Sequence, residues 1–249
     1  MKLGVTIPLY NEEKFIEKTL IALRDQTDKD FRVFLCDNNS TDSSVKLIND
    51  FISSNKLDWF VVSETQKGTG AASDTGVRAA ISAGCDVVLR TDADSLPHRD
   101  WVERMRAKFA SDERIAMVSG LSIPIRSEVS SFNFWSYRFF AWIATMFGVF
   151  RASNYGGGAR SIYIMAAGNN MAVRGNYYIE AGGFPRTTIE QAHEDRELVN
   201  QMRRHGMKVV RDRSAVVEVS ARRIEAWGIV RSLEWYRSHR KPEQNVDIR

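Results

Sequence analysis

The first half of the chain alternates short apolar runs with longer amphipathic segments. Apolar positions that recur every three or four residues are typical of helices, and short apolar runs bounded by turn residues are typical of buried strands. The expected strands are 3–7, 32–36, 59–62 and 86–89, and the expected helices are 12–24, 43–52 and 71–83. This alternation predicts βαβ units and a mostly parallel sheet.

The pattern changes after Arg99. We expect helices over 101–109, 176–181 and 194–205, and strands over 115–121, 162–166 and 208–210. Between them lies the strongly aromatic segment 132–150, whose uninterrupted apolar part begins only after Arg138. That part is shorter than the about 20 residues that a helix needs to cross a bilayer. We therefore expect no transmembrane helix here.

Composition limits the class of protein. With 249 residues, of which 43% are hydrophobic, the chain is long enough for one large α/β domain. The net charge of +4 suits anionic ligands such as nucleotides but does not imply nucleic acid. Cys36 and Cys85 lack metal-site spacing, which predicts buried thiols and a reducing compartment. The N-terminal apolar run is short and ends near Pro8, so we expect no secretory signal and a cytoplasmic protein.

Two carboxylates stand one residue apart directly after the expected strand 86–89. Asp92 and Asp94 would then lie at the carboxyl edge of the sheet, where open α/β folds bind ligands. Magnesium commonly takes one or two carboxylates together with substrate phosphates. An exposed acidic turn explains the same pair equally well, because aspartate also favours turns.

A tight turn follows the first expected strand and precedes the first expected helix. Tyr10 in this turn could stack on a planar base, and Asp37 at the end of the second strand could accept hydrogen bonds from the ring N–H of that base. The turn is a natural place for a ligand. A capped helix with an incidental tyrosine is the alternative.

Four short motifs follow one another along the chain, namely Pro-Leu-Tyr-Asn-Glu-Glu at 8–13, Asp-Asn-Asn-Ser-Thr-Asp at 37–42, Asp-Ala-Asp at 92–94 and Glu-Asp at 194–195. Together they resemble the ordered landmarks of family 2 glycosyltransferases with the GT-A fold. The resemblance covers nearly the whole chain. It implies a mostly parallel, twisted, nucleotide-binding sheet flanked by helices, in one domain with a nucleotide-sugar-binding half at 1–98 and an acceptor-binding half at 99–249.

The resemblance also implies the reaction. A sugar would pass from a nucleotide-sugar donor, with inversion, to a hydroxyl of a glycan, polysaccharide or lipid-linked saccharide, assisted by Mg²⁺ or Mn²⁺, as in cell-envelope polysaccharide synthesis. The implied donor-side residues are Pro8, Tyr10, Glu12 and Asp37 for the nucleotide, Asp92 for ribose or sugar, and Asp94 with Asp92 for the metal. A cation of this kind offsets the charge that develops on the departing diphosphate.

The acceptor side is implied in the same way. Asp195 matches the general base, which removes the proton of the acceptor hydroxyl, and Glu194 and the segment with Gly168, Asn169 and Asn170 match the acceptor-binding part. Without the resemblance, the two acids are more simply a helix cap, and the glycine-bearing segment is a turn.

One segment departs from the family pattern. The family usually carries Asn-x-Gly-x-x-x-Ala-Arg-Asn, whereas residues 66–74 end in Ser73 and Asp74. The usual basic contact to the donor is therefore missing, and Lys67 and Arg78 are the candidate replacements. Arg222, late in the chain, could also reach the diphosphate or an anionic acceptor, although a solvated surface arginine is equally expected there.

Three other functions of α/β domains fit these residues less well. A Rossmann oxidoreductase needs Gly-x-Gly-x-x-Gly after the first strand, and this chain has Pro-Leu-Tyr-Asn at 8–11. A nucleotidyltransferase needs a glycine-rich, arginine-bearing N-terminal loop, which is absent. A non-catalytic nucleotide-sugar or carbohydrate-binding module of the same fold is the remaining alternative, but it has no need for a general base at Asp195.

The aromatic segment 132–150 and the basic tail 222–249 could together form an interfacial surface. Aromatic and basic side chains suit the headgroup layer of a membrane, which favours a peripheral protein on the inner face of the membrane. Alternatively the two segments pack on each other or on a second subunit in a homodimer, because large apolar patches mark interfaces of several kinds.

Overall fold

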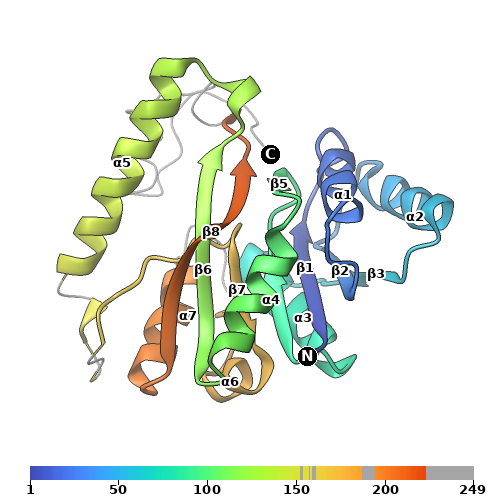
Figure 1. The fold of residues 1–249 in the computed structure, drawn as a ribbon. Helices are drawn as coiled ribbons and strands as arrows, with labels where there is room; N and C mark the ends of the chain where they lie inside the picture. The colour runs from blue at the N-terminus through green and yellow to red at the C-terminus, as the bar shows by residue number, and fades with distance from the viewer. Residues whose placement is uncertain (152–153, 157, 159–160, 187–193, 223–249) are drawn as a thin grey trace.

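The computed structural model describes residues 1–151, 154–156, 158, 161–186 and 194–222. Its strands are β1 (Leu3–Leu9), β2 (Phe31–Asp37), β3 (Trp59–Ser63), β4 (Val87–Arg90), β5 (Ser95–Pro97), β6 (Ile115–Pro124), β7 (Met171–Arg174) and β8 (Lys208–Val219). Its helices are α1 (Ile16–Arg24), α2 (Ser44–Asn55), α3 (Thr69–Ser82), α4 (Trp101–Ser111), α5 (Ser131–Phe150), α6 (Gly175–Glu180) and α7 (Glu194–Arg204), with a short 3₁₀ turn η1 at Arg126–Glu128. The strands form one sheet in the order β3-β2-β1-β4-β7-β6-β8-β5 (Figure 1).

The first four strands in this order are parallel, as the sequence predicts. β1 is buried along its whole length, because it is apolar on both faces and has a parallel neighbour on each side. The register pairs Leu9 with Asp37 and Thr6 with Arg90. The segments that follow β1, β2 and β4 therefore leave the sheet at the same edge.

The other half of the sheet is mixed. β7 runs antiparallel between β4 and β6, β6 is parallel to β8, and β5 is an antiparallel edge strand. The strand expected at 162–166 is wrong, because these residues form no strand and β7 fills the place between β4 and β6. β8 continues to Val219, well beyond the expected 208–210, because it pairs with β6 along its length.

The start of the first helix also differs from the expectation. It begins at Ile16 rather than Glu12, because residues 11–15 form a turn in which Asn11 has a φ of 55° and the Glu12 carbonyl accepts from the N–H groups of Phe15 and Ile16. This turn holds part of the expected nucleotide site.

Two apolar cores lie on the two faces of the sheet. One joins the β1 and β4 side chains to α1 and α4 around Trp101, and the other joins α3, α6 and α7 around Tyr178. Cys36 and Cys85 are both free and buried, as expected. α5 lies at the side of the molecule away from α1 and α2 (Figure 1). Among the described helices, none is long and apolar enough to cross a membrane.

Candidate active site

The turns after β1 and β2 are bound to each other. The N–H of Asn11 donates to Ser40 Oγ at 3.0 Å, and the N–H of Glu12 donates to Ser44 Oγ at 2.8 Å. Asp37 accepts from the N–H of Ser40 at 3.1 Å. Tyr10 is exposed. The structure therefore brings the expected base-binding residues Tyr10 and Asp37 to one edge and leaves the tyrosine ring open to solvent.

Arg90 connects the two acidic segments of the site. Its guanidinium is buried at the end of β4, with Nη2 at 3.6 Å from Asp92 Oδ1 and 3.1 Å from Glu194 Oε1. The guanidinium also lies over the Phe184 ring, 5.1 Å from its centroid. Burial lowers the pKa of Arg90, but the nearby carboxylates more than offset this and the pKa is raised. Arg90 thus carries a positive charge that joins the end of β4 to Glu194, 104 residues further along the sequence.

Arg90 was not among the residues that the sequence singled out. One feature of the sequence could have indicated Arg90: it is a charged residue at the end of an otherwise apolar strand, just before Asp92 and Asp94. Such a residue must be buried with the strand, and buried charge requires charged partners. The sequence alone does not say which acids those partners are.

Asp195 lies next to this guanidinium at the start of α7. Its Oδ2 accepts from the N–H of Gly168 at 3.3 Å, and its Oδ1 accepts from the N–H of Arg196 at 2.6 Å. Burial raises the pKa of Asp195 to about 6, and the negative charge of Glu194 adds to this effect. The positive charge of Arg90 and the hydrogen bonds from the two N–H groups lower the pKa of Asp195 and so offset part of this rise. A carboxylate with such a pKa can accept a proton near neutral pH.

The glycine at 168 allows this arrangement. A Cβ at that position would lie 2.6 Å from Arg90 Cζ, so any side chain would displace the guanidinium. Asn169 binds Ser122 through its Oδ1, at 2.7 Å. The backbone of the expected acceptor segment therefore lies directly against the arginine that joins the acidic segments.

Two of the residues expected to contact ligands are buried in the structure. Asn170 is fully buried, donating to the carbonyls of Leu121 and Ala215 and accepting from Trp101 Nε1. These hydrogen bonds of the Asn170 amide hold the loop against the sheet, so the amide does not face an acceptor. Pro8 is buried inside β1 opposite Cys36, so it supports the end of the strand and offers no surface to a nucleotide.

A second arginine joins two more of the acids expected on the donor side. Arg222 Nη2 lies 2.9 Å from Glu12 Oε1 and 3.2 Å from Asp94 Oδ2. Together with Arg90, it places five carboxylates, at Glu12, Asp92, Asp94, Glu194 and Asp195, around two guanidinium groups. The site is therefore rich in negative charge and suited to a cation.

The comparison with protein families decides the class. The sequence model described as Glycosyl transferase family 2 matches residues 5–172, which is more than half of the chain. The chain belongs to this family. It is 31% identical over 103 residues to the glycosyltransferase AglE of Haloferax volcanii, covering 41% of this chain and 33% of that protein. It is 30% identical over 115 residues to a chondroitin synthase of Escherichia coli, covering 46% of this chain and 16% of that protein.

Solved structures show the same fold. The mannosyltransferase PcManGT from Pyrobaculum calidifontis, in complex with GDP-Man and Mn²⁺, matches with a TM-score of 0.66 and 22% identity, covering 97% of this chain and 65% of that one. TarS of S. aureus matches with a TM-score of 0.62 and 17% identity, covering 94% of this chain and 39% of that one. The expected GT-A fold is confirmed. The matched part of the chain covers about a third of the length of AglE.

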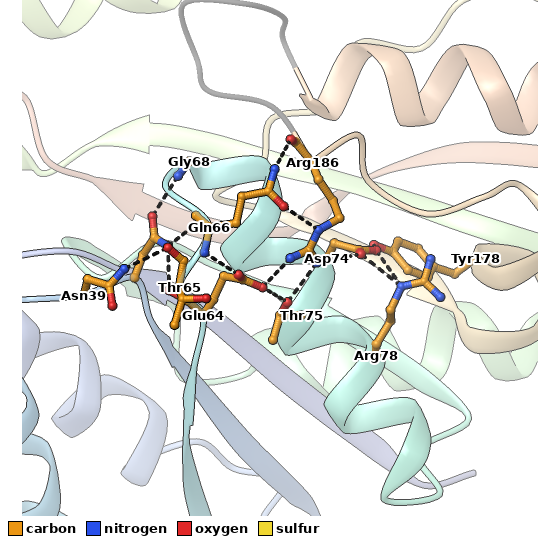
Figure 2. A network of polar contacts seen from close by, with 11 residues as sticks. Asn39, Glu64, Thr65, Gln66, Gly68, Asp74, Thr75, Arg78, Tyr178 and Arg186 are labelled. Carbon is orange, nitrogen blue, oxygen red and sulfur yellow. Dashed lines mark hydrogen bonds and ion pairs between the residues drawn. The ribbon is translucent and has the colours of Figure 1, made fainter.

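The departure from the family motif has a structural counterpart. Asp74 lies in a polar network that joins α3 to residues far along the chain (Figure 2). Arg78 Nε binds Asp74 Oδ1 at 2.9 Å, Arg186 Nη1 binds Asp74 Oδ2 at 3.2 Å, and the Tyr178 hydroxyl donates to Asp74 at 2.8 Å. Arg186 Nη2 also binds Glu64 at 2.5 Å.

This network affects the two expected replacement cations differently. Arg78 is engaged by Asp74 and donates to the carbonyl of Gly182, so it fastens α3 to the α6 end. Lys67 is exposed in the loop before α3, and its contact with the donor stays a prediction. Arg186 is a residue that the sequence did not single out. Its Nε donates to Gln66 Oε1, so it connects the loop before α3 to the segment that ends at residue 186 (Figure 2).

The residues present fit a divalent metal on a diphosphate. Asp92 and Asp94 supply two carboxylates in the short segment between β4 and β5, and Mg²⁺ commonly takes one or two carboxylates plus phosphate oxygens. The described residues contain no group of three or more His, Cys, Asp or Glu that could hold a metal by itself. A metal here would therefore need the donor diphosphate to complete its ligands.

Proposed function

We propose that this protein is an inverting glycosyltransferase that moves a sugar from a nucleotide-sugar to an acceptor hydroxyl, with Asp195 as the general base. The observation that carries the proposal is that Asp92 and Glu194 both pair with the buried guanidinium of Arg90. It brings the acids expected at the donor and the acids expected at the acceptor to a single site. A binding module would have no use for a carboxylate held there with a raised pKa.

The proposed reaction is one in-line displacement. The Asp195 carboxylate accepts the proton of the acceptor hydroxyl while the acceptor oxygen forms its bond to the anomeric carbon, and the bond from that carbon to the diphosphate oxygen breaks. Mg²⁺ or Mn²⁺, held by Asp94 and Asp92, would offset the charge on the leaving diphosphate. Arg90 keeps Glu194 in place and limits the rise of the Asp195 pKa.

The donor side has support from the residues and from the relatives. Tyr10 offers an exposed ring for a base, and Asp37 lies at the adjacent strand end. The neighbour PcManGT was solved with GDP-Man and Mn²⁺, and TarS was solved with UDP-GlcNAc. We therefore propose a nucleotide-sugar donor with Mg²⁺ or Mn²⁺ for this protein as well.

A donor screen tests the proposal. The melting temperature is measured with UDP-, GDP- and dTDP-sugars, each with and without Mn²⁺, because a ligand that binds only the native state raises it. We expect at least one donor to raise it, more strongly with Mn²⁺, and the same donor to be slowly hydrolysed. Absence of any shift and of any hydrolysis across all three bases would contradict the proposed function.

We further propose that the acceptor is lipid-linked and that α5 rests on an anionic membrane surface. Seven apolar side chains on α5 are between 38 and 80% exposed, namely Phe132, Trp135, Phe139, Trp142, Met146, Phe147 and Phe150. Most of them recur every three to four residues and share one helix face. The helix has no acidic residue, and its exposed Arg138 packs on the Phe134 and Trp135 rings.

These features suit a bilayer better than a protein partner. Aromatic side chains and arginine on one helix face are typical of helices that lie in the headgroup layer. Asn154, just after α5, accepts from Arg196 Nε at 2.8 Å, so the helix is tied to the residue next to Asp195. The basic tail that was expected to join this surface lies outside the described residues, apart from Arg222.

Flotation with vesicles of phosphatidylcholine and phosphatidylglycerol checks the α5 surface. We expect the protein to float, and Trp135→Ser/Trp142→Ser to reduce the bound fraction several-fold, since two exposed aromatic side chains are lost. Ile21→Ser/Leu47→Ser, which removes two exposed apolar residues of α1 and α2, serves as the matched control. A wild type that stays unbound, or a Trp variant that changes only the oligomeric state, would contradict membrane docking.

A further inference from the structure

Arg222 bridges two segments of the donor side that are far apart in the sequence. Its Nη1 and Nη2 donate to the two carboxylate oxygens of Glu12, at 3.1 and 2.9 Å. The same Nη2 lies 3.2 Å from Asp94 Oδ2. The guanidinium lies over the Phe15 ring, 4.7 Å from its centroid. A bidentate, charge-assisted pair of this kind fixes the orientation of the guanidinium plane.

The backbone that carries Arg222 is held independently of these contacts. Glu128 of η1 accepts from Ser220 Oγ at 3.2 Å and from the N–H of Ala221 at 3.1 Å. β8 leads directly into this point and is paired with β6 as far as Val219. The guanidinium can therefore change partners by side-chain rotation while the backbone of residues 220 and 221 keeps its place.

The charges around Arg222 bear directly on metal binding. Burial lowers its pKa, but Glu12, Asp94 and Asp92 more than offset this and the pKa is raised, so the group stays charged. Asp94 is the carboxylate proposed to hold the divalent cation. A cation on Asp94 would share that carboxylate with the guanidinium, and like charges a few ångströms apart repel strongly. Arg222 and a divalent cation therefore compete for Asp94.

We propose that Arg222 is the resting counter-cation of the metal site. It neutralises Asp94 in the absence of metal, gives up this carboxylate when Mg²⁺ or Mn²⁺ binds, and turns to the diphosphate of the donor, which offers it a replacement anion. This inference rests on the proposed function. It makes metal binding weak without nucleotide and stronger with it, and by reciprocity the metal strengthens nucleotide binding by the same factor.

Titration of Mn²⁺ alone, followed by the electron paramagnetic resonance signal of the free ion, tests the competition. Arg222→Gln removes the charge and keeps hydrogen-bonding capacity. We expect it to bind Mn²⁺ about five- to tenfold more tightly than wild type, a size typical of coupled sites. In the presence of Mn²⁺ it should bind UDP or GDP, whichever the wild type prefers, more weakly by calorimetry. Arg222→Lys keeps the charge and should bind Mn²⁺ alone as wild type does.

Arg204→Gln is the matched control, since Arg204 pairs with the partly exposed Glu197 on α7 and should change neither affinity. Equal Mn²⁺ affinity in wild type and Arg222→Gln would overturn the inference while leaving the proposed function intact. If neither binds Mn²⁺ even with nucleotide present, both fail. If Arg222→Gln does not fold, as judged by its melting curve, Arg222→Ala takes its place, since it also removes the charge. A Mn²⁺ affinity above that of wild type then supports the inference, and an unchanged Mn²⁺ affinity overturns it.

Discussion

Asp195→Asn is expected to reduce kcat by about 10²–10⁴-fold, the contribution typical of a positioned general base, with little change in donor affinity. The amide has nearly the shape of the carboxylate but cannot accept the acceptor proton. The hydrogen bonds of Asp195 are with Gly168 and the start of α7, so the variant breaks no hydrogen bond of the donor side. Initial rates of transfer and calorimetry with the nucleoside diphosphate measure the two quantities.

Glu197→Gln is the matched control for this variant. Glu197 lies on the same helix and pairs with Arg204, so its substitution should leave turnover unchanged. Because the pKa of Asp195 is raised to about 6, wild-type kcat should fall tenfold per pH unit below that value as the base becomes protonated, and level off above it. Turnover in Asp195→Asn at the level of wild type would refute the assignment of the base.

Asp94→Asn is expected to lower kcat/KM by about a thousandfold, equivalent to roughly 4 kcal/mol at the transition state. The variant removes one carboxylate from the pair proposed to hold the cation, so the charge on the departing diphosphate is less well offset. Removing metal from the wild type with a chelator should have a similar effect. Rates across a Mn²⁺ series measure both.

Asp100→Asn controls for the loss of an aspartate near the sheet edge, because Asp100 pairs with the exposed Arg104. It should keep wild-type kcat/KM and wild-type dependence on Mn²⁺. A fully active Asp94→Asn, or a wild type that transfers sugar at an undiminished rate in chelator, would remove the cation from the proposed mechanism.

Some of the site follows from local sequence because strand ends are local features. Asp37 closes β2 and Asp92 follows β4, and the parallel order of β2, β1 and β4 carries both to one edge. The alternation of apolar runs and amphipathic segments is sufficient to predict that these strands are parallel. Tyr10 and Glu12 are placed by the same reasoning, since they follow the strand between the other two.

The acceptor half was harder to predict because its strands do not follow the βαβ pattern. β7 is four residues long and reaches its place between β4 and β6 from a glycine-bearing segment. Nothing in the local pattern distinguishes it from a turn. Asn170 was assigned to the acceptor on the strength of its segment, but the loop before β7 turns its amide into the sheet.

What the sequence determined by itself is the α/β architecture and the set of acids available for chemistry, because both depend on periodicity and on residue type near strand ends. Only the tertiary structure decided that Arg90 joins Asp92 to Glu194 and that Arg222 joins Glu12 to Asp94. Such pairings depend on which segments the sheet order brings within a few ångströms of each other, and buried charges take whichever partner that order provides.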